Sequence, residues 1–158
     1  MPISYLINTK YNCLEVVCRG LITDREVLEA RLDYLSGADW VPGMPELVDL
    51  GAADFSKITP AGIEQIAGIV DQIYRANGLT RVKVGVYTRD LLPSVITALY
   101  RDFSRDLVEQ IRVFDDLSAA RLWLVGRSAP EEPVPKPPLP VNMRQIGQIA
   151  RFSASKRT

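Results

Sequence analysis

The chain has 158 residues, of which 47% are apolar and 24% charged, and its 19 basic and 19 acidic residues give no net formal charge. This composition predicts a globular protein of about one domain, without the roughly 18-residue apolar run that spans a bilayer. The N-terminal MPISYLINTK lacks the layout of a secretory signal, so we expect a cytoplasmic protein. Histidine is absent, which excludes the usual nucleophile triads and the common zinc and iron ligand sets.

The N-terminal sequence predicts a β-hairpin. Apolar and polar residues alternate over about 3–7 and again over 14–18, and Gly20 ends the second strand. Cys13 and Cys18 lie five positions apart in that strand, so their thiols face opposite sides about 16 Å apart. This separation is too large for a disulfide, and we expect two free, buried cysteines.

A helix, a strand and a second helix follow the hairpin. The first helix begins at a capping box near residue 24. The run LVDL at 47–50 predicts a buried strand that ends in an acidic loop of small residues. That loop leads to Thr59 and Pro60, a helix cap followed by proline at the first helical position. The second helix is predicted over about 60–76.

The rest of the folded region continues to alternate strands with helices. The order β-β-α-β-α-β-α-β-α predicts an α/β fold with a single mixed sheet of four or five strands and about four flanking helices. The sheet is mostly parallel, and the N-terminal hairpin adds one antiparallel strand at its edge or second position. The later elements are predicted as a strand at 82–87, a helix at 91–108, a short strand at 111–114, and a last helix that begins at Asp115 or Asp116, buries Ala120, Leu122, Trp123 and Leu124, and ends at Gly126.

The composition changes after this region. We expect an α/β domain over 1–128, a proline-rich linker over 129–140 and a basic tail over 141–158. All 19 acidic residues lie at or before Glu132, so the first 132 residues carry a net charge of −5 and the remainder +5. This asymmetry favours self-association, as a homodimer through the tail. The alternatives for the tail are packing on the acidic body of its own chain, binding to an anionic surface such as a membrane, and an inert end. No nucleic-acid partner and no integral membrane segment are expected.

Three segments resemble one family in register: VVCRGLIT, PGMPELVDLGAADFSKITPAG and RVFDDLSAARLWL. They resemble the STAS-type, SpoIIAA-like fold, in particular its small stand-alone bacterial members, over about residues 2–126. The resemblance implies a mixed sheet of four or five strands flanked by helices. A second branch of the superfamily resembles CRAL-TRIO lipid carriers, in which an apolar cavity lies between the sheet and the helices.

Classical members of this family are anti-sigma-factor antagonists that are switched by phosphorylation. The phosphorylated Ser belongs to an Asp-Ser-Ser-Gly-like motif just before the second helix. In this chain those four positions hold Lys57, Ile58, Thr59 and Pro60. The residue at the phosphoacceptor position is therefore Ile58, which has no hydroxyl, and Ser56 and Thr59 are out of register. We do not expect the classical kinase switch.

Two candidate sites follow from the pattern. The first is the N-terminus of the second helix, where backbone N–H groups favour an anion or a partner carboxylate. Thr59 alternatively only caps this helix. Asp49 and Asp54 are candidate paired carboxylates, although such residues more often serve turns and caps. The residues of the first site are Asp54, Ser56, Lys57 and Thr59.

The second candidate site is the third helix, which carries Tyr100, Arg101 and Phe103 and is expected to face a partner or ligand. Its alternative role is a packing stripe with a solvated charged edge.

These observations favour a non-catalytic regulatory or protein-interaction module without a cofactor or a metal. The alternative is a carrier or sensor of a small apolar or lipid ligand. An enzyme is not expected, because the chain lacks histidine and any nucleophile constellation. The observation that separates the two main hypotheses is an enclosed apolar cavity of roughly 300 Å³ or more.

Overall fold

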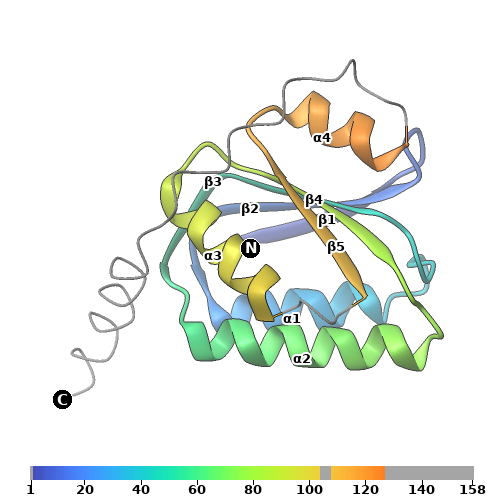
Figure 1. The fold of residues 1–158 in the computed structure, drawn as a ribbon, viewed down its shortest axis with the longest axis horizontal. Helices are drawn as coiled ribbons and strands as arrows, with labels where there is room; N and C mark the ends of the chain where they lie inside the picture. Colours follow the sequence, from blue (N-terminus) through green and yellow to red (C-terminus); the bar gives the residue numbers. More distant parts are fainter. Residues whose placement is uncertain (1, 104–107, 127–158) are drawn as a thin grey trace. The chain divides into compact units, whose positions relative to one another are not determined.

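Five strands form a single mixed sheet whose spatial order, β1-β2-β3-β4-β5, follows the chain (Figure 1). β1 pairs antiparallel with β2 at one edge, and all other neighbours are parallel. The computed structural model describes residues 2–103 and 108–126, so the predicted linker and tail lie outside the described residues. The predicted fold class and element order are confirmed. The elements are β1 Ile3–Asn8, β2 Cys13–Thr23, α1 Asp24–Leu35, β3 Glu46–Lys57, α2 Pro60–Ala76, β4 Val82–Tyr87, α3 Leu91–Phe103, β5 Glu109–Phe114 and α4 Leu117–Leu124.

The helices divide unequally between the two faces of the sheet. α1, α2 and α3 cover one face, and α4 alone packs on the other (Figure 1). The main hydrophobic core lies under α1–α3, whereas a small cluster of Leu47, Ala120 and Leu124 lies under α4. Leu124 packs directly over Gly85 of β4, where a Cβ atom would lie 3.4 Å from the Leu124 side chain, an ordinary van der Waals distance. Most of the buried apolar side chains therefore lie on the face of the sheet that α1, α2 and α3 cover.

Two strands are longer than the sequence predicted. β2 continues past Gly20 to Thr23, and β3 continues through the predicted acidic loop to Lys57. The two extensions pair with each other in parallel, for example Gly20 with Ala53. Gly20 adopts a φ of +70° beside a register shift, which a residue with a side chain would not readily accept. Within the extension of β3 the buried Ala53 and Phe55 alternate with the exposed Asp54 and Ser56. The sequence did not indicate this strand because most of its residues are small or acidic.

Other predictions need smaller corrections. The third helix is described from Leu91 to Phe103, residues 104–107 of its predicted range lie outside the described part of the chain, and Val108, its predicted last residue, is not helical. In the last helix Leu122 is 38% exposed and does not belong to the core. Trp123 is half-buried and packs against Phe114 with ring centroids 5.6 Å apart. Among the described residues no helix combines the length and the apolar character that a membrane crossing requires.

The two cysteines are free and buried, as predicted. Burial raises the pKa of Cys13 to about 11 and that of Cys18 to about 12. Because the thiolate is the reactive form, both thiols should be nearly inert in the native protein. We expect a thiol-reactive chromogenic disulfide at pH 8 to label the native protein very slowly and to titrate two thiols at once in denaturant. Rapid labelling of either cysteine in the native state would contradict this prediction.

Candidate functional site

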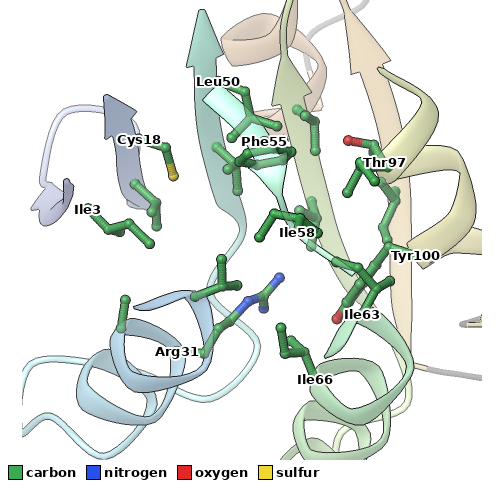
Figure 2. Close-up of a pocket in the computed structure, with 18 of the residues that line it drawn as sticks. Ile3, Cys18, Arg31, Leu50, Phe55, Ile58, Ile63, Ile66, Thr97 and Tyr100 are labelled. Carbon is green, nitrogen blue, oxygen red and sulfur yellow. The ribbon is translucent and has the colours of Figure 1, made fainter. Parts of the chain in front are cut away.

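An apolar pocket of about 100 Å³ lies between the sheet and the three helices α1, α2 and α3 (Figure 2). Aliphatic side chains from all three helices and from the sheet form most of its wall. β3 supplies Leu50 from its predicted part and Phe55 from its extension, and Ile58 follows directly after the strand. The pocket thus depends on the part of β3 that the sequence predicted as a loop. Arg31, Tyr34, Thr97 and Tyr100 are the polar residues of the lining.

A buried ionic cluster stands at the polar end of this pocket. Nη1 of Arg31, from α1, lies 2.9 Å from Oε1 of Glu109 and 3.3 Å from Oε2 of Glu46. The side chain of Arg31 is 12% exposed, while those of Glu46 and Glu109 are 0% and 1% exposed. One guanidinium therefore faces two carboxylates almost without solvent.

The strand register explains why the two glutamates meet. Glu46 of β3 pairs with Val84 of β4, and Glu109 of β5 pairs with Val82. Val82 and Val84 are two positions apart on one strand, so they share a face. The two carboxylates therefore flank β4 on the face that α1 covers, and Arg31 reaches both from that helix.

Tyrosine hydroxyls complete the cluster. Tyr74 donates a hydrogen bond to Oε1 of Glu46 at 2.7 Å, and Tyr34 donates to Oε2 at 3.3 Å. The guanidinium carbon of Arg31 lies 6.0 Å from the ring centroid of Tyr34 and 5.7 Å from that of Tyr100. Burial, together with Glu109, raises the pKa of Tyr100. These phenols therefore stay protonated, and the hydroxyls of Tyr34 and Tyr74 serve as hydrogen-bond donors to Glu46.

Burial dominates the protonation of the cluster. It raises the pKa of Glu46 above its usual value, because the opposing effects of Arg31 and of the two tyrosine hydrogen bonds are smaller. Burial also disfavours the charge on Arg31, but the oxygens of Tyr34, Glu109 and Glu46 outweigh it and raise the pKa of the guanidinium. Arg31 thus remains a cation, and Glu46 holds a proton more readily than an ordinary glutamate does.

The predicted anion site at the start of α2 already contains a carboxylate of the chain itself. Thr59 is the N-cap, as predicted, and its hydroxyl accepts a hydrogen bond from the N–H of Gly62 at 3.0 Å. Its own hydroxyl and N–H donate to Asp24, at 2.6 and 2.9 Å. Asp24 therefore occupies the position next to the helix N-terminus that an anion would take. Binding of an external anion or partner there stays a prediction.

The other residues predicted for that site lie on the β3 extension. Asp54 accepts a hydrogen bond from the N–H of Ser56 at 2.9 Å, and this interaction lowers the pKa of Asp54. Lys57 is exposed at the end of the strand. Asp49 accepts a comparable bond from Gly51. Each aspartate thus holds a backbone N–H two residues further on, as in an Asx turn.

The contact between Asp24 and α2 requires Gly62. A Cβ atom at this position would overlap the carboxylate of Asp24. We expect Gly62→Ala to lower the free energy of unfolding by about 1–2 kcal/mol, because it disrupts the cap. The matched control is Gly68→Ala on the same helix, where no atom lies within 4 Å and alanine should stabilise by about 0.5–1 kcal/mol. Urea unfolding of both variants tests this, and equal effects would contradict it.

The third helix separates its predicted residues. Tyr100 is buried and lines the pocket, whereas Arg101 is exposed and Phe103 is 38% exposed. Figure 2 shows Tyr100 directed from α3 toward the region of Arg31. The structure therefore brings Tyr100 to the pocket and leaves the other two on the outer surface. In residues 2–103 and 108–126 no group of three or more Cys, Asp or Glu side chains is arranged to hold a metal ion.

Sequence analysis missed Arg31, Glu46 and Glu109. The available signal was weak: each glutamate stands immediately before an apolar strand, which is also typical of a loop edge. Arg31 lies between apolar residues of an amphipathic helix and is 78 positions from Glu109. Only the parallel order of β3, β4 and β5 brings these side chains together.

A mixed five-stranded sheet with three helices on one face and one on the other is a SpoIIAA-like α/β fold, as the sequence motifs indicated. A solved structure similar to this chain is that of an uncharacterized protein of the DUF3478 family from Shewanella loihica PV-4, described as having a SpoIIAA-like fold. The similarity covers 77% of this chain and 91% of that one, with 15% sequence identity and a TM-score of 0.50. At this identity the comparison shows the fold alone. No protein-family model and no curated protein matches the sequence.

Proposed function

We propose that this protein is a non-catalytic regulatory module that recognises a small apolar molecule in the pocket under α1–α3. The observation that carries this proposal is the pocket itself, an apolar space with one polar end in the centre of the domain. Catalysis is not part of the proposal, since Asp49 and Asp54 each bind a local backbone N–H and histidine is absent.

The size of the pocket limits the ligand. At about 100 Å³ it is well below the roughly 300 Å³ at which drug-sized ligand pockets begin. A lipid with a long acyl chain does not fit this volume. The volume falls short of the roughly 300 Å³ that we set for a carrier or sensor, so our proposal is confined to recognition of a ligand of only a few non-hydrogen atoms and excludes carriage of a lipid.

The third helix offers a route from ligand to protein partner. Its inner side contributes Ile96 and Tyr100 to the pocket, and its outer side presents Arg101 and the half-exposed Phe103. A ligand that shifts Tyr100 therefore acts on the same helix that a partner would contact. This arrangement supports a regulatory role in which a ligand that displaces Tyr100 also displaces Arg101 and Phe103, within one turn of the same helix. Self-association through the tail stays a prediction, because residues 141–158 lie outside the described part of the chain.

A variant that fills the pocket tests the proposal. Ala30 lines the pocket, and Ala30→Met should occupy it with the longer side chain. We expect native mass spectrometry of the full-length protein purified from cells to detect a small bound mass that disappears on denaturation and is absent from Ala30→Met. The matched control is Glu29→Met, at the adjacent exposed position of α1, which should keep the bound mass. Consistent absence of any bound mass from the wild type would leave a pure protein-interaction module.

A further inference from the structure

We propose that the pocket recognises an uncharged molecule that carries one hydrogen-bond acceptor, such as a ketone, ester or amide carbonyl, on a small apolar body, and that Arg31 is the donor. This inference rests on the proposed function, because it specifies the ligand of the same pocket. It follows from the hydrogen bonds of Arg31, from the charges around it and from the volume of the pocket.

Arg31 has unused donors at the polar end. A guanidinium carries five N–H groups on three nitrogens. Both ion-pair contacts of Arg31 are made by Nη1 alone. Nε and Nη2 donate no hydrogen bond to any residue within 2–103 or 108–126. Since Arg31 lines the pocket, these donors are available to a ligand.

Two other polar side chains of the lining are already engaged. The hydroxyl of Thr97 donates to the carbonyl oxygen of Pro93 at 2.8 Å, and that of Tyr34 donates to Glu46. A ligand that enters the pocket therefore meets apolar side chains over most of its surface and, at one end, the guanidinium of Arg31 together with Tyr100, whose ring centroid lies 5.7 Å from the guanidinium carbon. An acceptor group on the ligand satisfies that donor, and an apolar group without one leaves it unsatisfied.

The charges around Arg31 exclude a charged ligand. The guanidinium faces the carboxylates of Glu46 and Glu109, so the three groups together carry a net charge of −1, or zero when one carboxyl group is protonated. The cluster has no net positive charge to compensate a buried carboxylate or phosphate on a ligand. A ligand cation would lie against the guanidinium itself. A ligand with an uncharged acceptor buries no uncompensated negative charge and places no positive charge against the guanidinium.

The volume sets the scale of the apolar body. A cavity of about 150 Å³ lined by Leu, Ile and Phe holds benzene. A pocket of about 100 Å³ therefore accepts a group no larger than benzene, of about six non-hydrogen atoms at most. Cyclopentanone is a probe at this upper limit with one carbonyl acceptor. Cyclopentane, cyclopropanecarboxylate and cyclopentylamine are probes that do not exceed it in number of non-hydrogen atoms and carry no acceptor, a negative charge and a positive charge.

Titration of the full-length wild-type protein with these four probes, followed by ¹H–¹⁵N NMR, tests the inference without a variant that has to fold. We expect cyclopentanone to bind at least about tenfold more tightly than cyclopentane, as a hydrogen bond to a charged donor predicts. It should also bind more tightly than both charged probes. The Arg31 Nε–Hε resonance should shift with cyclopentanone and not with cyclopentane. The Nε–Hε resonance of Arg25, which is exposed and paired with Glu29, is the internal control and should not move.

Each remaining outcome overturns a defined part of the argument. Equal binding of cyclopentane and cyclopentanone, or tight binding of cyclopentanone without a shift at Arg31, refutes the inference that Arg31 donates to an acceptor on the ligand. The proposed function, recognition of a small ligand in the pocket, would still hold. Tighter binding of cyclopropanecarboxylate than of cyclopentanone refutes the proposal that the ligand is uncharged. If none of the four probes binds, the proposed function fails together with the inference.

Discussion

Replacement of Arg31 by methionine is expected to lower the free energy of unfolding by about 3–5 kcal/mol at neutral pH. Methionine keeps much of the apolar stem but removes the only cation that faces Glu46 and Glu109 among the described residues. Two carboxylates that are 0% and 1% exposed would then lie side by side without compensation. The cost comes from burying unpaired charge and not from the lost attraction itself, so it greatly exceeds that of a surface ion pair.

Urea unfolding of the full-length protein measures this effect. Arg25→Met is the matched control on the same helix, because Arg25 and Glu29 are 85% and 60% exposed, and we expect no measurable change from it. Neutralising both carboxylates in the Arg31→Met background, as Glu46→Gln with Glu109→Gln, should recover most of the loss. A loss below about 1 kcal/mol for Arg31→Met, or a triple variant no more stable than the single one, would show that unpaired charge on Glu46 and Glu109 does not determine the stability of this cluster.

Local sequence signals predicted the order of the elements well. The hairpin follows from the alternation of apolar and polar residues. The cap Thr59 was predicted outright, and Thr23 and Asp116 are each one of two adjacent residues that the sequence offered as caps. These signals act over two to four residues, so neighbouring positions contain them. The extension of β3 was missed because its stability comes from pairing with β2, which is distant in sequence. The extension itself is rich in small and charged residues, which do not indicate a strand.

The pocket and its ionic end could not be predicted for a related reason. Arg31, Glu46 and Glu109 belong to three different elements, and each has an ordinary local environment in the sequence. Their proximity depends on which strands are neighbours and on their register. A charged residue at a strand start is more often solvated than buried. The free space beside the cluster depends on packing density, which no local pattern encodes.

Ile58 stands at the position that the family resemblance assigns to the phosphorylated Ser, and it also lines the pocket. The resemblance places Ile58 where classical members carry the phosphorylated Ser. In this structure Ile58 is 6% exposed and lines the pocket. The side chain at this position therefore points into the domain, where it helps to enclose the apolar space. In our proposal, input to this protein comes from a ligand on the inner side of this segment and not from a kinase on its outer side.

The difference in stability between wild type and Glu46→Gln is expected to change with pH, with the variant gaining on the wild type as the pH rises above about 4.5. Burial raises the pKa of Glu46 in the folded state above the usual value of 4.5. Between these two pKa values the native state binds more protons than the unfolded chain, so the free energy of unfolding of the wild type falls as the pH rises. The full slope for one proton is about 1.4 kcal/mol per pH unit. Glutamine cannot ionise, and its side-chain oxygen can still accept the hydrogen bond from Tyr74.

Urea unfolding of both proteins from pH 4 to pH 8 measures this difference, and using the difference cancels the titration of all groups that the substitution leaves alone. Gly68→Ala, which changes no ionisable group and has no atom within 4 Å of the added Cβ, is the control and should show a difference that is nearly independent of pH. A pH-independent difference for Glu46→Gln would mean that Glu46 titrates alike in both states. A difference that changes in the opposite direction would mean that Arg31 and the tyrosines hold Glu46 ionised. In that case the cluster would carry its full negative charge, which would weaken its discrimination against a cationic ligand and strengthen that against an anionic one.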